Sequence, residues 1–494
     1  MSLLATLNTA ARSLSAQTKV VEVVQHNVAN ANTPSYHRQE AVLKAGTPYG
    51  DIRFISSTGE GQMGTGVVVE QIKRFNLQFF DGRYRLELGA SKQWEAYQGV
   101  LQQVEAILAE TSQDGLTNKL DAFWSGWQLL NSDPSSLALR ADLRDRAVAL
   151  TNAFSRRAEQ LQNSRADLDL TIKDRVEEIN SIARQLAELN QEIPRVRALD
   201  NEPNDLLDER DRLLDRLSEI SGQQAFDQEN GENIVSIGGH ALVVGTQTFE
   251  LVTTPDAANE NLLRIDWADG QPFTATTGEL RGYLDARDQA ITDQLDGLNQ
   301  LAQVMNDQVN ALHQDGYSMA YPGGLPPPYP PDPASPYTFP APYNAYPFFT
   351  IDDPTDQARS FRVSDYIMND LENIAAAETA DSAPGDGNMA RQISDLQVAQ
   401  FVIGGDTTTM NQFYTGKIGT LALETQRAER NFKDLGTIVR SLSDQREAVN
   451  GVNLDEEATN LMQSQKAYNA AARVLTAIDD MIDRIINSTG RVGL

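Results

Sequence analysis

The sequence contains no cysteine in its 494 residues. This absence excludes disulfide bonds, zinc sites with cysteine ligands and every reaction that needs a thiol. The sequence also lacks a run of about 18 apolar residues, which a membrane-spanning helix would need. Residues 1–20 alternate leucine with serine, threonine and asparagine, so the continuous apolar core of a cleaved signal peptide is missing as well. We expect no membrane insertion, and export, if it occurs, by a route without a cleaved signal peptide.

Positive charge is scarce too. The chain has 69 Asp and Glu residues against 41 Lys and Arg residues, which gives a formal net charge of −28. Nucleic acids and anionic membranes are bound by basic surfaces, so this composition disfavours both as partners. Solubility is the simplest explanation of the acidic balance. With 40% hydrophobic residues the chain can still form true cores, and its length corresponds to roughly three domains of ~150 residues.

Motifs of catalysis and metal binding are missing as well. The four histidines are scattered, none of them lies in an H-E-x-x-H pattern, and no G-x-S-x-G motif is present. Gly59–Gly64 reads G-x-G-x-x-G, yet Val67–Val69 follows as a predicted strand, whereas a dinucleotide site needs a helix at that point. The sequence therefore gives no support for catalytic residues, a cofactor site or a metal site. The alternative of a nucleotide-binding enzyme rests on the glycine motif alone.

What the sequence does contain is a narrow apolar stripe at each end. The 3-4 spacing of such a stripe is the seam of a coiled coil, which is too narrow to form a core and needs a partner helix. We therefore predict terminal helices over 3–30 and 454–487 that pair with each other and then assemble. The predicted seam residues are Leu4, Leu7, Ala11, Leu14, Val21, Val28, Leu454, Ala458, Leu461, Tyr468, Ala472, Leu475, Ile482 and Ile486.

The predicted N-terminal helix carries little charge. Outside its seam only Arg12, Lys19 and Glu22 are charged, and serine, threonine, asparagine, glutamine and alanine occupy the other positions. A face of this kind can be buried against neighbouring molecules at a lower desolvation cost than an ordinary surface helix.

Between the two ends the pattern is mainly helical. Helical periodicity covers 85–221, 279–313 and the chain from about Met389 onward, with breaks expected at Pro134, Pro194 and Pro203. Short strands are predicted at Asp51–Ser56, Val67–Ile72, Asn233–Ile237, Ala241–Val244, Phe249–Thr253 and Leu262–Trp267, with a further extended stretch at Phe348–Val363. The predicted fold class is mainly α with an inserted β domain: terminal helices paired as a coiled coil, a central helical bundle and a small outer β domain.

These patterns define the expected domains. A terminal coiled-coil domain combines 1–40 with 450–494. A helical-bundle domain combines 41–224, 276–320 and 348–449 and includes a short β segment at 41–80. The β insertion is 225–275. Residues 321–347 hold 11 of the 20 prolines with five interspersed tyrosines, which is typical of an extended surface loop or spacer.

Residues 27–39, Asn-Val-Ala-Asn-Ala-Asn-Thr-Pro-Ser-Tyr-His-Arg-Gln, resemble the N-terminal signature of the bacterial flagellar axial proteins of rod, hook and junction. The signature usually reads N-(I/V)-(A/S)-N-x-N-T-x-G-Y-x-R-Q, so Ser35 replaces its usual glycine. Rod and hook proteins usually continue with Gly-Phe-Lys, and the ending found here resembles instead the hook-associated protein 1 family of hook–filament junction proteins. The matching signature residues are Asn27, Asn30, Asn32, Thr33, Tyr36, Arg38 and Gln39. Residues 278–288 and 451–475 resemble further segments of that family, whereas 225–275 resembles it weakly.

The resemblance implies a non-enzymatic structural component of the bacterial flagellum that forms the adapter ring at the hook–filament junction. It implies an extracellular location reached by type III export without a cleaved signal peptide. The implied partners are other copies of the chain, the hook protein, the second junction protein (hook-associated protein 3) and a cytoplasmic export chaperone at the C-terminal helix. Neither a nucleic acid nor a cofactor is implied.

Two alternatives to this interpretation stay open. Another flagellar axial protein, of the hook or rod, would share the N-terminal signature, but hook proteins are mostly β and lack the long helical middle. A surface adhesin would use the β insertion and the proline- and tyrosine-rich stretch for binding.

Overall fold

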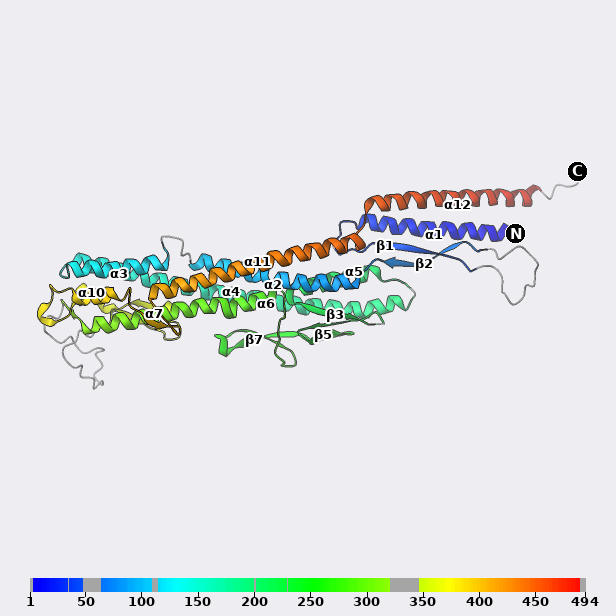
Figure 1. Ribbon diagram of the computed structural model, residues 1–494. Coiled ribbons are helices and arrows are strands. Elements are labelled where there is room, and N and C mark those ends of the chain that lie inside the picture. Colours follow the sequence, from blue (N-terminus) through cyan, green and yellow to red (C-terminus); the bar gives the residue numbers. More distant parts are fainter. Residues whose placement is uncertain are drawn as a thin grey trace, which may run out of the picture.

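The computed structural model describes residues 3–33, 35–47, 64–108, 114–199, 201–228, 230–319 and 346–488. The molecule is a long rod, and both termini lie at the same end of it (Figure 1). There the helices α1 (Leu3–Ala29) and α12 (Leu454–Ser488) run side by side and extend beyond the rest of the rod. The predicted pairing of the terminal helices is thereby confirmed.

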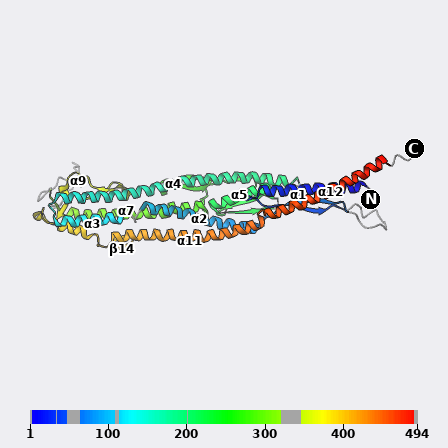
Figure 2. The same cartoon turned by 90° about the horizontal axis from the view of Figure 1, so that it is seen from above.

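Long helices form the body of the rod. They are α2 (Gln78–Leu108), α3 (Leu116–Ser132), α4 (Leu137–Arg197), α5 (Asn204–Ser221), α6 (Glu279–Asp285), α7 (Ile291–Asp315) and α11 (Met410–Asn450), and a π-helical turn at Ala286–Ala290 joins α6 to α7. Viewed from above, α4 and α11 lie along opposite edges of the rod, with α2 and α7 between them (Figure 2). The predicted class, mainly helical with inserted β structure, is confirmed.

The helix α4 is 61 residues long and passes through Pro194, where a break was expected. Proline removes one backbone donor from a helix, and it costs least near a helix end. Pro194 lies within the last turn before Arg197, and its carbonyl still accepts a hydrogen bond of 2.9 Å from the Ala198 amide. The other two prolines do lie at helix boundaries, since Pro134 lies between α3 and α4 and Pro203 caps α5.

The β structure is antiparallel throughout its named pairs. The strands β1 (Gln39–Ala45) and β2 (Val67–Arg74) form a hairpin that packs against α1, on the side away from α12 (Figure 1). The inserted β structure has two parts. One is a four-stranded sheet in the order β3 (Gln223–Asp227), β4 (Asn233–Ile237), β5 (His240–Val244) and β6 (Gln247–Thr248). The other is the hairpin of β7 (Leu251–Asp256) and β8 (Leu262–Trp267), which has the 3₁₀ turn Ala257–Asn259 at its tip.

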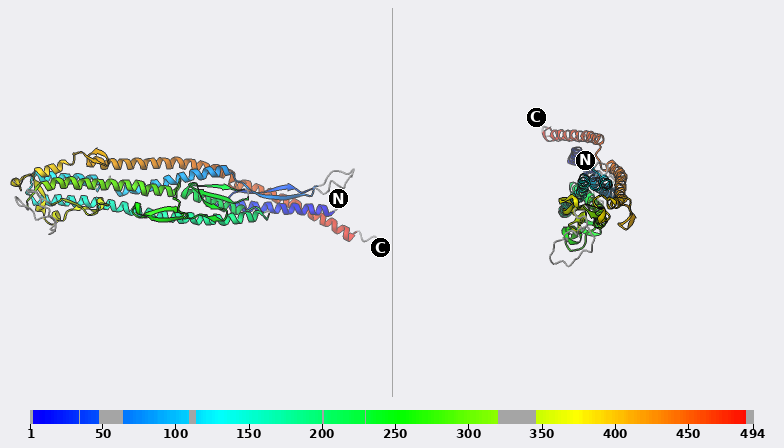
Figure 3. Two further views of the ribbon diagram at one scale, coloured as in Figure 1. Left: turned by 90° about the horizontal axis from the view of Figure 1, so that it is seen from below. Right: turned by 90° about the vertical axis from the view of Figure 1, so that its left-hand side faces the viewer.

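Short elements fill the end of the rod opposite the termini (Figure 3). Between α7 and α11 lie β9 (Tyr317–Ser318), β10 (Phe349–Ile351), α8 (Gln357–Ser360), β11 (Phe361–Val363), α9 (Asp365–Asn369), β12 (Ala375–Ala377), α10 (Asn388–Asp395), β13 (Phe401–Ile403) and β14 (Asp406–Thr408), with 3₁₀ turns at Leu371–Asn373 and Ala380–Ser382. Helices were expected from about Met389 onward, and α10 begins at Asn388, but the β13–β14 hairpin separates it from α11. Gly404 and Gly405 form the turn of this hairpin with φ of 63° and 92°, a conformation that glycine adopts without strain.

Two apolar cores follow one another along the rod, and α4 contributes to both. The first lies around Trp124, Trp127 and Phe348, which are fully buried, and it joins α2, α3, α7 and the first half of α4. The second joins the other half of α4 to α5 and the inserted strands around Ile179, Leu217 and Trp267. The β insertion therefore shares a core with the helices that carry it.

Several predicted features lie outside the described residues: the strand Asp51–Ser56, all but the last residue of the Gly59–Gly64 motif, most of the proline- and tyrosine-rich stretch, and the side chain of Leu4. In the part that is described, none of the helices combines the length and the hydropathy required to cross a membrane.

Candidate assembly site: the terminal helix pair and its joint to the bundle

The α1–α12 pair is held by small and apolar side chains. On α1, Ala10, Ala16, Val23 and Val24 are buried between α12 and the β1–β2 hairpin. Alanines at such positions allow neighbouring backbones to approach closely. On α12, the buried or half-buried positions repeat at steps of three and four residues, which places them on one face of the helix. They are Glu457, Asn460, Leu461, Ser464, Ala467, Ala471, Ala472, Leu475, Ile478 and Ile482.

The predicted seam residues fall into two groups. Leu7, Leu14, Val21, Leu461, Ala472, Leu475 and Ile482 are half-buried. Ala11, Val28, Leu454, Ala458, Tyr468 and Ile486 are exposed in the isolated chain. Apolar residues occupy a wider arc of α12 than α1 covers. Several sets of positions with three- and four-residue spacing therefore fit the sequence, and the predicted seam combined covered and uncovered positions.

Asn27 is the centre of the joint at the base of the pair. This side chain is 1% exposed, and its amide makes every hydrogen bond that its shape allows. Its Nδ2 donates to the Gln39 carbonyl (2.8 Å) and to Glu457 Oε2 (3.2 Å). Its Oδ1 accepts from the Gln39 amide (3.0 Å) and from the Tyr36 hydroxyl (2.8 Å). Asn27 thereby connects α1, the signature turn, β1 and α12.

Glu457 is the partner on α12 and is also 1% exposed. Its Oε1 accepts a charge-assisted hydrogen bond of 2.7 Å from Arg38 Nε, while Arg38 NH1 lies 3.1 Å from the more exposed Glu456. The Arg38 amide in turn donates to the Asn450 carbonyl at the end of α11 (2.8 Å). We call Asn27, Arg38 and Glu457 the terminal clasp, because they join residues more than 400 positions apart in the chain.

The signature turn itself is built from short-range bonds. Asn30 Nδ2 donates to the His26 carbonyl (3.1 Å), and Thr33 Oγ1 donates to Asn30 Oδ1 (3.2 Å), while Asn32 is exposed. Ser35 has φ of 62°, in the left-handed region that favours glycine. That conformation accounts for the glycine at this position of the signature.

A row of aspartates on α5 joins the terminal pair to the bundle. Asp205, Asp208, Asp211 and Asp215 are spaced by three, three and four residues, so they lie on one face of the helix. We call these four residues the aspartate row. Asp205 Oδ1 accepts from Gln39 Nε2 (3.2 Å), and Asp208 Oδ1 lies 2.7 Å from both His37 Nδ1 and Arg74 Nε.

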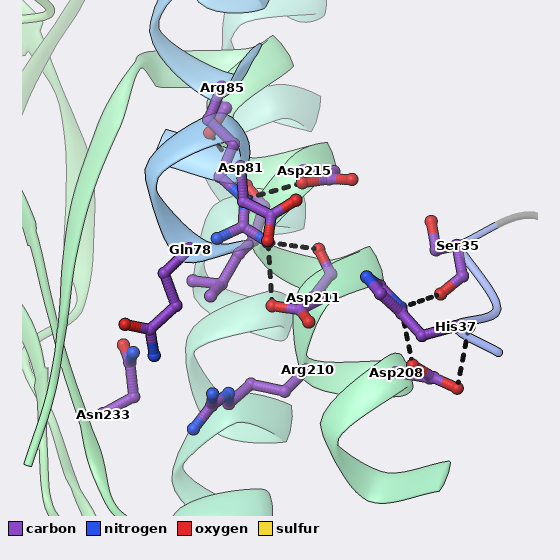
Figure 4. Close-up of polar contacts among 12 residues, drawn as sticks. Ser35, His37, Gln78, Asp81, Arg85, Asp208, Arg210, Asp211, Asp215 and Asn233 are labelled. Carbon is purple, nitrogen blue, oxygen red and sulfur yellow. Dashed lines mark hydrogen bonds and ion pairs between the residues drawn. The ribbon is translucent and has the colours of Figure 1, made fainter. Parts of the chain in front are cut away.

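The remaining two aspartates bind the helices α2 and α11. Asp211 accepts hydrogen bonds from Arg74 and Arg85, and Asp215 accepts from Arg85 Nε (2.6 Å). Asp215 also accepts from Arg446 NH1 on α11 (2.9 Å), and Arg446 Nε lies 2.7 Å from Asp81. Figure 4 shows Asp208, Asp211 and Asp215 of this row, with Asp208 directed toward His37 of the signature turn and Asp215 toward Arg85. One helix thus binds five separate segments of the chain.

The charges of this joint are strongly coupled. Burial alone would raise the pKa of Asp211, but Arg85 and Arg74 outweigh it and hold the pKa well below its usual range. Burial raises the pKa of Asp81, against the opposing effect of Arg446. Burial, with Asp208 nearby, likewise raises the pKa of Tyr36. The joint is therefore a structural ion network, and among the described residues no three His, Asp or Glu side chains are arranged to hold a metal ion.

Comparison with known proteins finds relatives along almost the whole chain. Residues 101–325 match the "Flagellar hook-associated protein FlgK helical domain" profile, and residues 448–488 match the "Flagellar basal body rod FlgEFG protein C-terminal" profile. "Flagellar hook-associated protein 1" of Bacillus subtilis is 27% identical over 98% of both chains, and the Escherichia coli protein of the same name is 24% identical over 97% of this chain and 99% of its own. Over almost its whole length the chain is similar to the flagellar hook-associated protein 1 family. This is a family of structural, non-enzymatic flagellar proteins.

The fold agrees with a solved member of the hook-associated protein 1 family. The flagellar hook junction protein FlgK of Burkholderia pseudomallei superposes with a TM-score of 0.61 at 16% sequence identity. The alignment covers 74% of this chain and all of that one. At this level of identity the likeness concerns the fold alone.

Sequence reasoning missed the aspartate row and Glu457. The row is visible in the sequence as D-x-x-D-x-x-D-x-x-x-D over 205–215, on an amphipathic helix whose leucines face the second core. In a chain with 69 acidic residues that spacing does not stand out. Glu457 lies in the first turn of α12, where acidic residues are common, and its burial depends on Arg38 and Asn27, which lie far away in the sequence.

Removing the Tyr36 hydroxyl at the edge of the clasp should have a moderate effect. Tyr36→Phe deletes the hydroxyl that donates to Asn27 Oδ1 and lies 3.0 Å from His26 Nδ1, and we expect the terminal pair to lose about 1 kcal/mol, since the buried Asn27 loses one of its donors. Amide exchange across α12 should then speed up roughly fivefold. Thr33→Ala, which removes an exposed bond of the same turn, is the control and should change exchange little. Equal effects of the two changes would contradict the role given to Tyr36.

Proposed function

We propose that this chain forms the adapter ring at the hook–filament junction, on which the flagellar filament is assembled. In this ring the α1–α12 pairs form the inner wall against neighbouring copies, the helical bundle forms the next layer, and the β insertion lies outside. The observation that carries the proposal is the apolar surface of α12 that α1 leaves uncovered.

This uncovered surface lies on both sides of the α1 contact. On one side, Val474, Met481 and Ile485 are 51%, 50% and 49% exposed and are spaced by seven and four residues. On the other side, Leu454, Tyr468 and Ile486 are exposed at spacings close to whole helical turns. We call these two sets the outer flanks of α12. Exposed apolar surface of this extent marks an interaction site, and a ring gives each pair one neighbour on each side.

The composition of α1 supports burial within such an assembly. Arg12, Lys19 and Glu22 are the charged residues of α1 besides His26, and Lys19 and Glu22 already pair with each other at 2.9 Å. Few charges would lose water when α1 meets a neighbouring pair, so the desolvation cost is small.

The proposal includes specific partners and a domain division. The ring contacts the hook protein on one side and the second junction protein, hook-associated protein 3, on the other, and a cytoplasmic export chaperone holds the C-terminal helix before export. The terminal domain is 1–40 with 450–494, the helical bundle is 41–224, 276–320 and 348–449, and the β insertion is 225–275, with 321–347 as a spacer. The packing of the β1–β2 hairpin on α1 supports its role as the contact between the first two domains.

Electron microscopy of flagella tests the function directly. A strain that lacks its own hook-associated protein 1 should carry hooks without filaments and release filament subunits into the medium. Expression of this chain should restore attached filaments, and a chain truncated before α12 should not. Filaments that attach equally well without any hook-associated protein 1 would contradict the adapter role.

The outer flanks can be tested without disturbing the fold of the isolated chain. Met481→Gln with Ile485→Gln changes two exposed side chains, so the stability of the isolated chain should change by no more than about 1 kcal/mol in total. Filament attachment should fall several-fold, because the neighbouring copy loses its apolar partner. Lys466→Gln with Arg473→Gln, two exposed changes elsewhere on α12, is the control. Full attachment with the Met481 and Ile485 variant would refute an inner wall made through this flank.

A further inference from the structure

The two helices at opposite edges of the rod carry opposite charge on their outer faces. On α4, five exposed carboxylates have no ion pair or side-chain hydrogen bond with any described residue: Glu159, Asp167, Asp174, Glu188 and Glu192. Their spacing places all five on one side of the helix, away from its buried residues. The exposed cations of this stretch, Lys173 and Arg184, are already paired with Glu177 and Glu250.

The outer face of α11 is basic instead. Arg427, Arg430, Lys433 and Arg440 are exposed, and no ion pair or side-chain hydrogen bond joins them to other described residues. They lie opposite the side of α11 that packs on α2. Two exposed acids, Glu429 and Asp434, share this stretch, so cations outnumber anions there in a chain whose net charge is −28. Copies of so acidic a chain repel one another unless a basic surface meets an acidic one.

Each face also has one large apolar side chain among its charges. Leu170 is 63% exposed on the acidic face of α4, and Leu423 is 67% exposed on the basic face of α11. A buried apolar contact within a charged rim is the usual composition of a protein interface. In Figures 2 and 3 the two helices follow opposite long edges of the rod and overlap along much of its length.

We propose that the outer face of α11 in one copy packs against the outer face of α4 in the next copy around the ring. The partner is therefore a second copy of this chain, and the contact rests on the proposed ring. The contact is heterologous, since two different faces meet, and a repeated heterologous contact closes into a ring when the rotations between successive copies add up to a full turn. Electrostatic complementarity of this kind sets the orientation and register of the copies.

The absence of cysteine allows a direct test. One cysteine is placed at Leu423→Cys and a second at Asn163→Cys, Leu170→Cys or Glu177→Cys, which lie about two helical turns apart along the acidic face. Flagella carrying each double variant are treated with a bismaleimide. At least one pair should yield a ladder of dimers, trimers and larger species, because every copy contributes both faces. Leu423→Cys with Val402→Cys, a second exposed site outside these faces, should yield no ladder.

Reversing the charges of the two faces provides a second test of the contact. Arg427→Glu with Arg430→Glu should abolish filament attachment, and adding Asp167→Arg with Asp174→Arg to the same chain should restore it, because both faces are then reversed together. Attachment at the unmodified level with the first pair of changes, or no ladder from reactive cysteines in assembled junctions, would overturn the contact. Failure of the unmodified chain to restore filaments would overturn the ring itself, so the two failures are distinguishable.

Discussion

Glu457→Ala is expected to release α12 from α1 and from the signature turn. The change leaves the buried amide of Asn27 without one acceptor and removes the closer carboxylate of Arg38. Removing the buried partner of this ion pair costs about 3 kcal/mol, because Arg38 keeps only the exposed Glu456 and the buried Asn27 amide loses an acceptor. Amide exchange at Leu475 and Leu7 should then accelerate by roughly 150-fold, whereas exchange in α4 should not change.

The neighbouring glutamate provides the control for this experiment. Glu456→Ala removes the second carboxylate near Arg38, but that side chain is 58% exposed, so we expect a cost below about 1 kcal/mol. The two variants differ by one residue in position and share the same arginine. If both accelerated exchange equally, the buried position of Glu457 would not be what holds α12. Glu457→Gln should be intermediate, because it keeps the shape and loses the charge.

The sequence predicted the terminal helices well and their contact face poorly, for one physical reason. A helix with apolar residues at 3-4 spacing is recognised from the pattern alone, so α1 and α12 were predicted to within about two residues. The contact face of α12 contains Glu457 and Ser464, which no search for apolar positions selects. Leu454 and Ile486 were selected instead and lie on an outer flank. A sequence pattern shows that a residue is apolar, not which of several neighbours covers it.

The joint was less predictable still, because it is made of long-range polar contacts. The signature residues Asn27, Tyr36 and Arg38 were identified through resemblance to a family, and nothing in their spacing indicated that they bind Glu457. Arg74, Arg85 and Arg446 look like ordinary surface residues in the sequence, since a charged side chain is exposed by default. Their burial follows only once α2, α5, β2 and α11 meet at one place.

The joint also bears on what the ring needs from each copy. An inner wall of helix pairs transmits load to the outer bundle only if the pair keeps a fixed orientation. The α11–α12 turn alone would allow rotation, but Arg38 binds the end of α11 and the start of α12 together. The aspartate row then connects that turn to α2 and α5. Buried ion networks of this kind contribute specific geometry more than net stability.

Asp211→Asn is expected to destabilise the joint by about 3 kcal/mol at neutral pH, because two buried arginines lose a shared carboxylate. The folded-state pKa of Asp211 lies below the ~3.9 of an unperturbed aspartate. Its stabilising effect is therefore complete above that pH and declines as the pH falls below it. The unfolding midpoint in urea should fall for the variant at pH 7, and the gap between variant and wild type should narrow as the pH decreases below about 4.

Glu209→Gln on the same helix is the matched control for that change. Glu209 pairs with Arg212 at the surface, where both side chains are more than 40% exposed, so its loss should cost less than about 1 kcal/mol. The two substitutions make the same carboxylate-to-amide change two residues apart on α5, one inside the joint and one outside it. A pH-independent gap between Asp211→Asn and wild type would mean that packing rather than ionisation of Asp211 maintains the joint. The pKa of Glu209 is also lowered by its hydrogen bond with Arg212, so a small narrowing toward acid is expected in the control as well. A clearly larger narrowing for Asp211→Asn would instead establish the buried carboxylate as the group that fixes the terminal pair to the bundle.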